Sequence, residues 1–347
     1  MITRRTILKT GAVAAVTTAT SLFAACTSSR PLSPQTKGGR SVETVTGPVD
    51  VSRSRWILTH EHVCLDPMET YGDKQTALSE AMRRLEQARE AGIDVVIDAT
   101  SFDIRRDVAF GREASLKSGM HIVASTGQHL YAPPSFNKTL EELADFFVQE
   151  LVTGIDGTGI KAGVIKVASA GEAMTPAEEK AFKAAAWAHA ATGAPIITHS
   201  NSRLRGGIQQ ADLLEAESVD PGQVIIGHSN DTDDLPYLEA LAKRGFMLGM
   251  DHMFWGNAAG ASLSSQARGE IIVRLIEAGY ASQIVLSNDW VLGDSDRDKV
   301  NPDGLLYTLR KTLPYLRARG VAEADIHAIT MENPKRWLTS ASSAAAG

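Results

Sequence analysis

Short apolar runs recur along the chain from Trp56 onward, and longer segments of mixed polarity separate them. Most runs are nearly continuous in Val, Ile and Leu, which is the pattern of strands buried on both faces of a parallel sheet. We therefore predict eight strands, at residues 56–60, 93–99, 121–126, 163–168, 195–199, 224–228, 246–251 and 284–289.

The segments between these strands have the spacing of amphipathic helices. Residues 77–92 and 177–193 each finish on a glycine, which commonly ends a helix. Residues 302–320 and 321–338 predict two more helices. Strands that alternate with helices predict an α/β fold, a (β/α)8 TIM barrel, preceded here by a short β-hairpin in residues 42–54. An open doubly wound sheet is the alternative, but no glycine-rich phosphate-binding motif follows the first strand.

The N-terminal stretch departs from this pattern. Basic residues precede an apolar run, residues 11–25, that is too short and too rich in Ala and Thr to span a bilayer stably. The TRRTILK segment resembles a twin-arginine export signal. We therefore expect residues 1–26 to be a signal peptide and residues 27–41, which are polar with Ser, Pro and Gly, to be a flexible linker. Residues 42–340 would form the barrel domain.

The signal predicts export to the periplasm or the cell envelope. The LFAAC sequence resembles a lipoprotein processing site, in which Cys26 would be acylated. Such an anchor is the only membrane contact we expect, because the formal net charge of −6 disfavours anionic surfaces and nucleic acid. Cys64 is the second of two cysteines, too few for a disulfide framework, and we expect it to pack in the core.

Polar residues with metal-binding chemistry gather where the predicted strands end. In a (β/α)8 barrel these C-terminal ends lie at one mouth, where active sites of this fold are built. The residues are His60, Glu61, His62, Lys166, His199, His228, Asp251, His252 and Asp289. Three other histidines, His121, His189 and His327, lie outside these ends, and we expect them to have packing roles.

The first strand end suits a metal ion. Residues i and i+2 of a strand point to the same side, so His60 and His62 can hold one ion while Glu61 faces elsewhere. Histidines from strands five and six and a carboxylate from strand eight complete a nitrogen and oxygen set that suits Zn²⁺, with Co²⁺ or Mn²⁺ as alternatives. One tetrahedral ion needs fewer ligands, so we predict two divalent metal ions.

Lys166 lies inside the apolar sequence GVIKVAS, where an unpaired ammonium would be costly. An ammonium has no lone pair with which to bind a cation. The amine, however, can take up CO2 to become a carbamate, whose two oxygens can bridge two metal ions. We therefore predict a CO2-derived carbamate on Lys166. An ion pair or a side chain that reaches the rim is the alternative.

The segment from Val42 to Leu338, nearly the whole mature chain, resembles the phosphotriesterase family of the amidohydrolase superfamily. The motifs that carry the resemblance are LTHEH (58–62), FDIRRDV (102–108), GVIKVA (163–168), THS (198–200), IGHSNDTDD (226–234), GMDH (249–252), SNDW (287–290) and VNPDG (300–304). Each motif alone is weak evidence, and their combination is highly specific.

The resemblance implies a more buried and a more exposed metal ion, bridged by carboxylated Lys166 and a hydroxide. The implied ligands are His60, His62 and Asp289 for the buried ion and His199 and His228 for the exposed one. The hydroxide would attack phosphorus or a carbonyl carbon. Asp289 would accept its proton, and His252 and Asp231 would relay that proton to solvent. A helix N-cap is the alternative role for Asp231.

Two loops differ from those of the family's phosphotriester specialists. Those enzymes have an aromatic residue after strand three, where this chain has His129, and the loop after strand seven, residues 253–270, looks shorter here. The lactonase branch has an Arg-Tyr pair where this chain has His252 and Met253. The candidate walls of the substrate pocket are His129, Tyr131, Phe254, Trp255 and Trp290, for which core packing is the alternative.

The predicted function is a binuclear metal-dependent hydrolase that cleaves organophosphate triesters, which are neutral small molecules. A lactonase or carboxylesterase with the same metal centre is the alternative, because the attack chemistry is shared. A surface-tethered binding protein without turnover is a third hypothesis, which the full set of ligands, base and relay disfavours. The resemblance also implies a homodimer.

Overall fold

The computed structural model describes residues 41–339. The predicted signal peptide and all but the last residue of the predicted linker lie outside this range. Strands β1 (Ser41–Thr44) and β2 (Gly47–Asp50) pair antiparallel, which confirms the predicted hairpin. Among the described helices, none combines the length and the apolar character that a membrane crossing requires.

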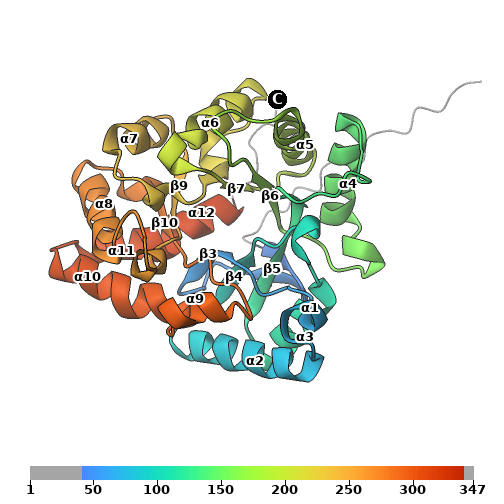
Figure 1. Cartoon of the computed structure of the whole chain (residues 1–347), viewed down its shortest axis with the longest axis horizontal. Coiled ribbons are helices and arrows are strands. Elements are labelled where there is room, and N and C mark those ends of the chain that lie inside the picture. The colour runs from blue at the N-terminus through green and yellow to red at the C-terminus, as the bar shows by residue number, and fades with distance from the viewer. Residues whose placement is uncertain (1–40, 340–347) are drawn as a thin grey trace, which may run out of the picture. The chain divides into compact units, whose positions relative to one another are not determined.

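Eight parallel strands form the central sheet, which curls into a nearly closed barrel (Figure 1). The strands are β3 (Ile57–Glu61), β4 (Val95–Asp98), β5 (His121–Gln128), β6 (Val164–Ala168), β7 (Ile196–His199), β8 (Val224–Ile226), β9 (Met247–Met250) and β10 (Ile284–Leu286). Each strand pairs with the next one along the chain. This order agrees with the predicted barrel and excludes the doubly wound sheet, whose strand order reverses at a switch point.

Helices surround the strands in Figure 1. The first eight are α1 (Pro67–Tyr71), α2 (Lys74–Glu90), α3 (Val108–Ser118), α4 (Leu140–Val152), α5 (Pro176–Thr192), α6 (Gly206–Ala216), α7 (Leu235–Lys243) and α8 (Ser265–Glu277). Helix α5 matches the helix predicted at 177–193. A capping box of Thr175 and Glu178 begins it, and Gly193 ends it in the left-handed conformation.

The C-terminal helices are shorter than the sequence pattern predicts. They are α9 (Ser295–Val300), α10 (Leu313–Ala318), α11 (Glu323–His327) and α12 (Asn333–Thr339). The segments predicted as single helices at 302–320 and 321–338 each contain a π-helical turn, at Thr308–Thr312 and Ala328–Glu332. Pro314 and Pro334 are the second residues after these turns. Proline cannot donate the regular helical hydrogen bond, and the wider turn accommodates that loss.

One hydrophobic layer inside the barrel receives a side chain from every strand. Its strand residues are Ile57, Val95, Ile97, Val123, Val164, Ile197, Ile225, Met247 and Val285. In β6, Val164 belongs to this layer, whereas Ile165 belongs to the larger cluster shared with the helices. Because side chains alternate along a strand, Lys166 points to the same side as Val164. It is only 1% exposed, so the sequence correctly predicts a buried lysine.

Backbone hydrogen bonds join β3 to the segment after β10 and so bring the two edges of the sheet together. The Asp289 amide donates to the His60 carbonyl at 2.9 Å, and the His62 amide donates to the Trp290 carbonyl at 2.8 Å. Both histidines of the first strand end therefore lie beside the carboxylate of the last one.

The side chain of Glu61 strengthens this closure. It is fully buried and accepts hydrogen bonds from Ser287 Oγ at 2.7 Å, the Asn288 amide at 2.9 Å and the Trp290 amide at 2.7 Å. Every one of these donors belongs to the segment that carries Asp289. The residue between the two histidines thus faces away from them and fixes the position of their neighbouring strand end.

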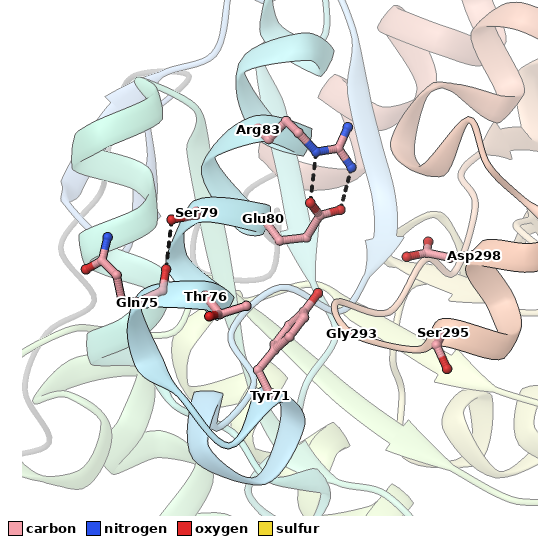
Figure 2. Close-up of a pocket in the computed structure, with 9 residues that line it drawn as sticks. All are labelled: Tyr71, Gln75, Thr76, Ser79, Glu80, Arg83, Gly293, Ser295 and Asp298. Atoms are coloured by element: carbon pink, nitrogen blue, oxygen red, sulfur yellow. Dashed lines mark hydrogen bonds and ion pairs between the residues drawn. The ribbon is translucent and has the colours of Figure 1, made fainter.

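A surface pocket of about 560 Å³ lies between α2 and the loop that leads into α9 (Figure 2). Its lining residues are Tyr71, Gln75, Thr76, Ser79, Glu80, Arg83, Gly293, Ser295 and Asp298. None of them is a candidate site residue, and the ion pair between Glu80 and Arg83 occupies one wall. This pocket is therefore separate from the polar strand ends.

Gly127→Ala should destabilise the protein strongly. Gly127 pairs with Lys166 across β5 and β6 at a φ of 114°, and a Cβ there would lie 1.8 Å from the Lys166 carbonyl oxygen. We expect the free energy of unfolding to fall by at least about 3 kcal/mol, measured by urea denaturation. Gly193→Ala is the matched control, with a φ of 76° and open space around it, and should cost about 1 kcal/mol. Equal losses in the two variants would contradict this steric explanation.

Candidate functional site

Six polar side chains from five strand ends converge at one mouth of the barrel. They form three close pairs, which are His60 Nε2 with Lys166 Nζ at 2.7 Å, His62 Nε2 with Asp289 Oδ1 at 3.2 Å, and His228 Nε2 with His199 Nδ1 at 2.8 Å. These are the six residues that the sequence predicts as metal ligands. The fold brings all of them into one cluster.

The backbone at this cluster is strained in two places. His228 and Asp289 have positive φ values of 58° and 50°, which are unfavourable for residues with a Cβ and often mark functional sites. In β3, the pairing register shifts between Leu58 and Glu61. This irregularity lets Ile57 and His60, three residues apart, both face the barrel interior.

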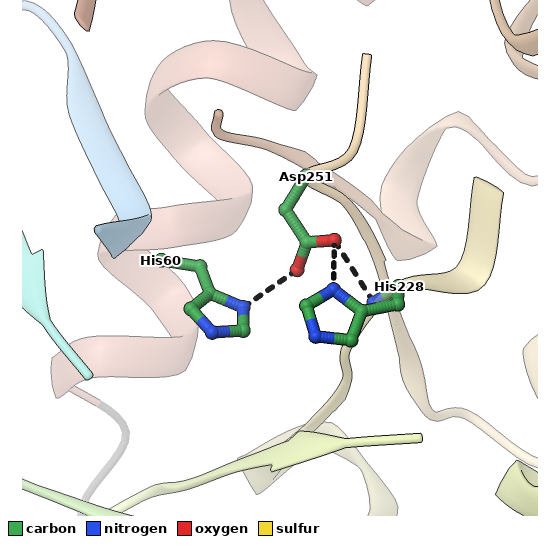
Figure 3. Close-up of side chains that lie close together, drawn as sticks. All are labelled: His60, His228 and Asp251. Atoms are coloured by element: carbon green, nitrogen blue, oxygen red, sulfur yellow. Dashed lines mark hydrogen bonds and ion pairs between the residues drawn. The ribbon is translucent and has the colours of Figure 1, made fainter. Parts of the chain in front are cut away.

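Asp251 holds two of the histidines together (Figure 3). Its Oδ2 lies 2.7 Å from His60 Nδ1, and its Oδ1 lies 2.9 Å from His228 Nδ1. Oδ1 also accepts the backbone amide of His228 at 2.9 Å. Because both carboxylate oxygens are engaged with Nδ1 atoms, the Nε2 atoms of both histidines face the cluster. A carboxylate that fixes histidine orientation in this way is typical of metal sites.

His62 is oriented by a neutral partner. Its Nδ1 lies 2.9 Å from Thr100 Oγ1, and its Nε2 faces Asp289. Three groups of described residues offer ligand atoms within 4.8 Å of one another, namely His60 with His62 and Asp289, His60 with His228 and Asp251, and His228 with His252 and Asp289. The chain therefore holds His and Asp groups that could bind metal.

A second set of contacts leads away from Asp289. His252 Nε2 lies 3.0 Å from Asp289 Oδ2, and His252 Nδ1 lies 2.8 Å from Asp231 Oδ2. Arg268 donates to Asp231 Oδ1. Burial opposes ionisation of Asp231, but the charge of His252 outweighs it and keeps the pKa of Asp231 below its ordinary value. The three predicted relay residues are thus in direct contact.

Burial dominates the electrostatics of the other side chains. It lowers the pKa of Lys166 to about 8. Burial and the positive charge of Lys166 together lower the pKa of His60 to about 3, and burial with the charge of His228 lowers the pKa of His199. The unprotonated forms of these groups, which are the forms that bind metals or react with CO2, are therefore favoured.

The five candidate pocket residues have different environments. His129 follows β5, and its ring packs edge-on against His199 at 4.9 Å. The Tyr131 ring, which is exposed, stacks on His129 at 5.4 Å. Trp255 is half-buried and lies 5.4 Å from the ring of His252. Phe254 and Trp290 have no exposed surface and belong to the core, so neither offers a wall to a substrate.

Three other histidines, His121, His189 and His327, and Cys64 lie apart from the cluster. His121 begins β5, and His327 ends α11. His189 is buried in α5, where its Nδ1 bonds the Ala194 carbonyl. Cys64 is buried in the hydrophobic core. The buried positions of His189 and Cys64 agree with the predicted packing roles. His121 is half-buried, and His327 is exposed, so the packing role predicted for His327 is wrong.

Sequence reasoning assigned no role to several residues that support the site. Asp251 stands in the GMDH motif and at a strand end, which were signals for a role, but its bonds to two histidines depend on the fold. Thr100, Arg268 and Arg297 stand in no metal-binding pattern. The contacts of Thr100 and Arg268 join elements far apart in sequence, so no local signal could have found them. Arg297 follows Asp289 by only eight residues, but an arginine is not a metal ligand and so gave no signal.

Residues 40–338 match the model of the phosphotriesterase family. The chain belongs to the phosphotriesterase family. The matched segment includes the whole barrel and every residue of the polar cluster, and it confirms the resemblance drawn from the motifs.

Curated relatives of the chain carry several different names. An aryldialkylphosphatase of Saccharolobus solfataricus is 33% identical over 75% of this chain and 85% of its own length. A phosphotriesterase homology protein of Mycobacterium tuberculosis is 31% identical over 85% of this chain and 96% of its own. An N-acetyltaurine hydrolase of Tetraodon nigroviridis is 27% identical over 86% and 97%. Family membership and the first relative identify the chain as a hydrolase acting on ester bonds.

The metal-free protein should lose stability between pH 6.5 and 8 through His252, in addition to a loss through Glu61, whose pKa burial raises to about 8. Burial alone would lower the pKa of His252, but Asp231 and Asp289 outweigh it and raise the pKa to about 9. The protonated imidazole therefore stabilises the fold fully below pH 6.5, and this contribution is lost as pH rises toward 9. We expect a fall of roughly 1–2 kcal/mol in the free energy of unfolding by pH 8, measured by urea denaturation.

Asp231→Asn should reduce this pH dependence to the part that Glu61 contributes. Asp233→Asn, which changes an exposed carboxylate nearby, is the control and should retain it. A fall as steep in Asp231→Asn as in the wild type would show that another group titrates.

Proposed function

We propose that the protein is a binuclear metal-dependent hydrolase that cleaves neutral phosphoric triesters. One observation carries this proposal. The Nε2 atoms of His60, His62 and His228 all face one cluster, while the Nδ1 atom of each is engaged by Asp251 or Thr100. Imidazoles that are fixed in this way present lone pairs at little orientational cost.

The donor set fits two divalent ions. His60, His62 and Asp289 would hold one ion and His199 and His228 the other, with Lys166 between the two groups. The 2.8 Å contact of His228 Nε2 with His199 Nδ1 supports this assignment, because two neutral imidazole nitrogens that face each other are suited to share a cation. A set rich in nitrogen favours Zn²⁺, with Co²⁺ or Mn²⁺ as alternatives.

Lys166 would supply the bridging anion as a carbamate. The neutral amine forms a bond to the carbon of CO2 and releases one proton. Burial lowers the pKa of Lys166 to about 8, so a substantial share of the amine is neutral near physiological pH. The product is a buried anion beside histidines whose unprotonated forms are favoured, which is the charge balance that two cations require.

When bound, the two ions would supply an activated hydroxide and polarise the bond under attack. Residues of the chain would then carry away the proton of the hydroxide. Asp289 would accept it, and His252, after its imidazole has released a proton on the Asp231 side, would receive it next at Nε2, 3.0 Å from Asp289 Oδ2. Asp231, 2.8 Å from His252 Nδ1, holds that imidazole in place and leads toward solvent. Arg268 keeps Asp231 ionised for this role.

Half-buried residues around the cluster would contact the substrate. His129 lies beside His199, and its buried Nδ1 has no hydrogen-bond partner among the described residues. Trp255 lies beside His252 on another side. These two side chains supply one polar and one aromatic contact, which suits a small neutral ester.

A lactonase or carboxylesterase is the second candidate. The polar His129 occupies the position where the family's phosphotriester specialists have an aromatic residue, which favours a carbonyl substrate. The relative named N-acetyltaurine hydrolase also favours attack at a carbonyl carbon.

The remaining features of the proposal concern the whole protein. Export through the TRRTILK signal, processing of residues 1–26, an acylated Cys26 in the cell envelope and a homodimer stay part of the proposal. They rest on the sequence and on the family resemblance.

The protein loaded with Zn²⁺ or Co²⁺ should hydrolyse an aryl dialkyl phosphate with a higher kcat/KM than an aryl ester or a lactone. The same centre would attack all three substrates, so only the shape and polarity of the pocket can distinguish them. Steady-state assays of one preparation on the three substrates measure the preference. A lactone favoured by orders of magnitude would establish the second candidate instead.

Lys166→Ala should lose bound metal and activity, because it removes the proposed bridge. Metal analysis should give close to two ions per wild-type chain and fewer in the variant, and a short carboxylic acid should restore part of the activity. Lys180→Ala, which removes an amine bonded to the Lys138 carbonyl, should retain both ions. Full metal content and activity in Lys166→Ala without added acid would refute the bridging role.

A further inference from the structure

Arg297, on the short helix α9, contacts Asp289 in a way that the proposed reaction does not use. Its Nη1 donates to the Asp289 carbonyl oxygen at 2.6 Å and to Asp289 Oδ2 at 3.1 Å. One guanidinium nitrogen thus binds both the backbone and the side chain of a central residue of the cluster.

The backbone bond bears on the strained conformation of Asp289. A φ of 50° is unfavourable for a residue with a Cβ. Two hydrogen bonds hold this conformation from opposite sides of the residue. The Asp289 amide donates to the His60 carbonyl at 2.9 Å, and the Asp289 carbonyl accepts from Arg297. Arg297 therefore donates one of the two hydrogen bonds that hold this backbone conformation.

The side-chain bond fixes the rotation of the carboxylate. Oδ1 of Asp289 faces His62 Nε2 at 3.2 Å. Oδ2 accepts from His252 Nε2 at 3.0 Å and from Arg297 at 3.1 Å. With Oδ2 held by two donors, only Oδ1 remains directed at the histidine nitrogens of the first strand.

The guanidinium of Arg297 is itself held in place. It lies 4.6 Å from the ring centroid of Trp255, in cation–π contact, and its Nε lies 3.0 Å from Asp294 Oδ2. Because Trp255 belongs to the loop after β9, Arg297 joins that loop to the loop after β10 directly above Asp289.

Helix α9 has a second attachment to the barrel on its other side. Asp298 Oδ1 accepts the indole N–H of Trp290 at 3.1 Å, and Asp298 Oδ2 lies 3.4 Å from Arg84 of α2. Figure 2 shows Asp298 and Ser295 of α9 on the wall of the surface pocket. The helix is thus anchored on one side by Asp298 and presents Arg297 to the site on the other.

We propose that Arg297 is a positioning residue for Asp289. It holds the left-handed backbone and the carboxylate rotation with which Asp289 binds metal, and it acts through Asp289 without touching substrate. This inference rests on the proposed metal-dependent function. It predicts that loss of the guanidinium weakens metal binding and lowers turnover while substrate binding changes little.

The test compares Arg297→Met, Arg297→Lys and a control, Arg310→Met. Arg310 forms an exposed ion pair with Asp303 outside the site. Co²⁺ is titrated into each metal-free protein and followed by its visible absorption in competition with a chelator. Steady-state kinetics with the best of the three ester substrates then give kcat and KM, and thermal unfolding gives the melting temperature.

We expect Arg297→Met to lower Co²⁺ affinity and kcat by about 10- to 100-fold with KM within about threefold of the wild type. Arg297→Lys should be intermediate, because a lysine keeps the charge but lacks the planar fork and the stacking surface. Arg310→Met should match the wild type. If Arg297→Met fails to fold, Arg297→Lys decides the matter by the same measurements.

Wild-type Co²⁺ affinity and kcat in the Arg297 variants would overturn this inference, even with a lowered melting temperature, because the role would then be structural only. A rise in KM with unchanged kcat would also overturn it. Failure of the wild-type protein to bind Co²⁺ would instead overturn the proposed function, and the inference with it.

Discussion

The buried carboxylate of Glu61 is the interaction on which the rest of the site depends. Among residues 41–339, its oxygens accept hydrogen bonds only from the segment 287–290, and these bonds join the last strand end to the first. Asp289 lies within that segment, and His60 and His62 flank Glu61. The three side chains therefore meet where the carboxyl group between the two histidines, together with the backbone hydrogen bonds of His60 and His62, closes the barrel.

Several basic side chains are buried together above the hydrophobic layer. Burying them in their charged forms would be costly without negative charge beside them. His60, His199 and Lys166 are all kept toward their unprotonated forms by burial. Asp251, Asp289 and Asp231 supply negative charge, each bound to at least one histidine. Lone pairs without protons, oriented by carboxylates, are the electrostatic setting that favours divalent cations.

Membership in the phosphotriesterase family and the site geometry support each other but answer different questions. The family model and the relatives identify a hydrolase acting on ester bonds. The geometry adds that the Nε2 atoms of His60, His62 and His228 face the cluster, whereas their Nδ1 atoms contact Asp251 or Thr100. In this chain the loops after the strands place His129, Trp255 and Arg297 around the site.

The sequence by itself determined the barrel and the positions of its polar strand ends, because strand periodicity and residue type are local properties. It determined that Lys166 is buried and that His60 and His62 share a side. Only the tertiary structure decided that Asp251 joins two histidines, that Phe254 and Trp290 belong to the core, and that two predicted helices are interrupted before Pro314 and Pro334. The contact of Arg297 with Trp255 needed it too, because this contact joins separate loops whose approach depends on packing rather than on local pattern.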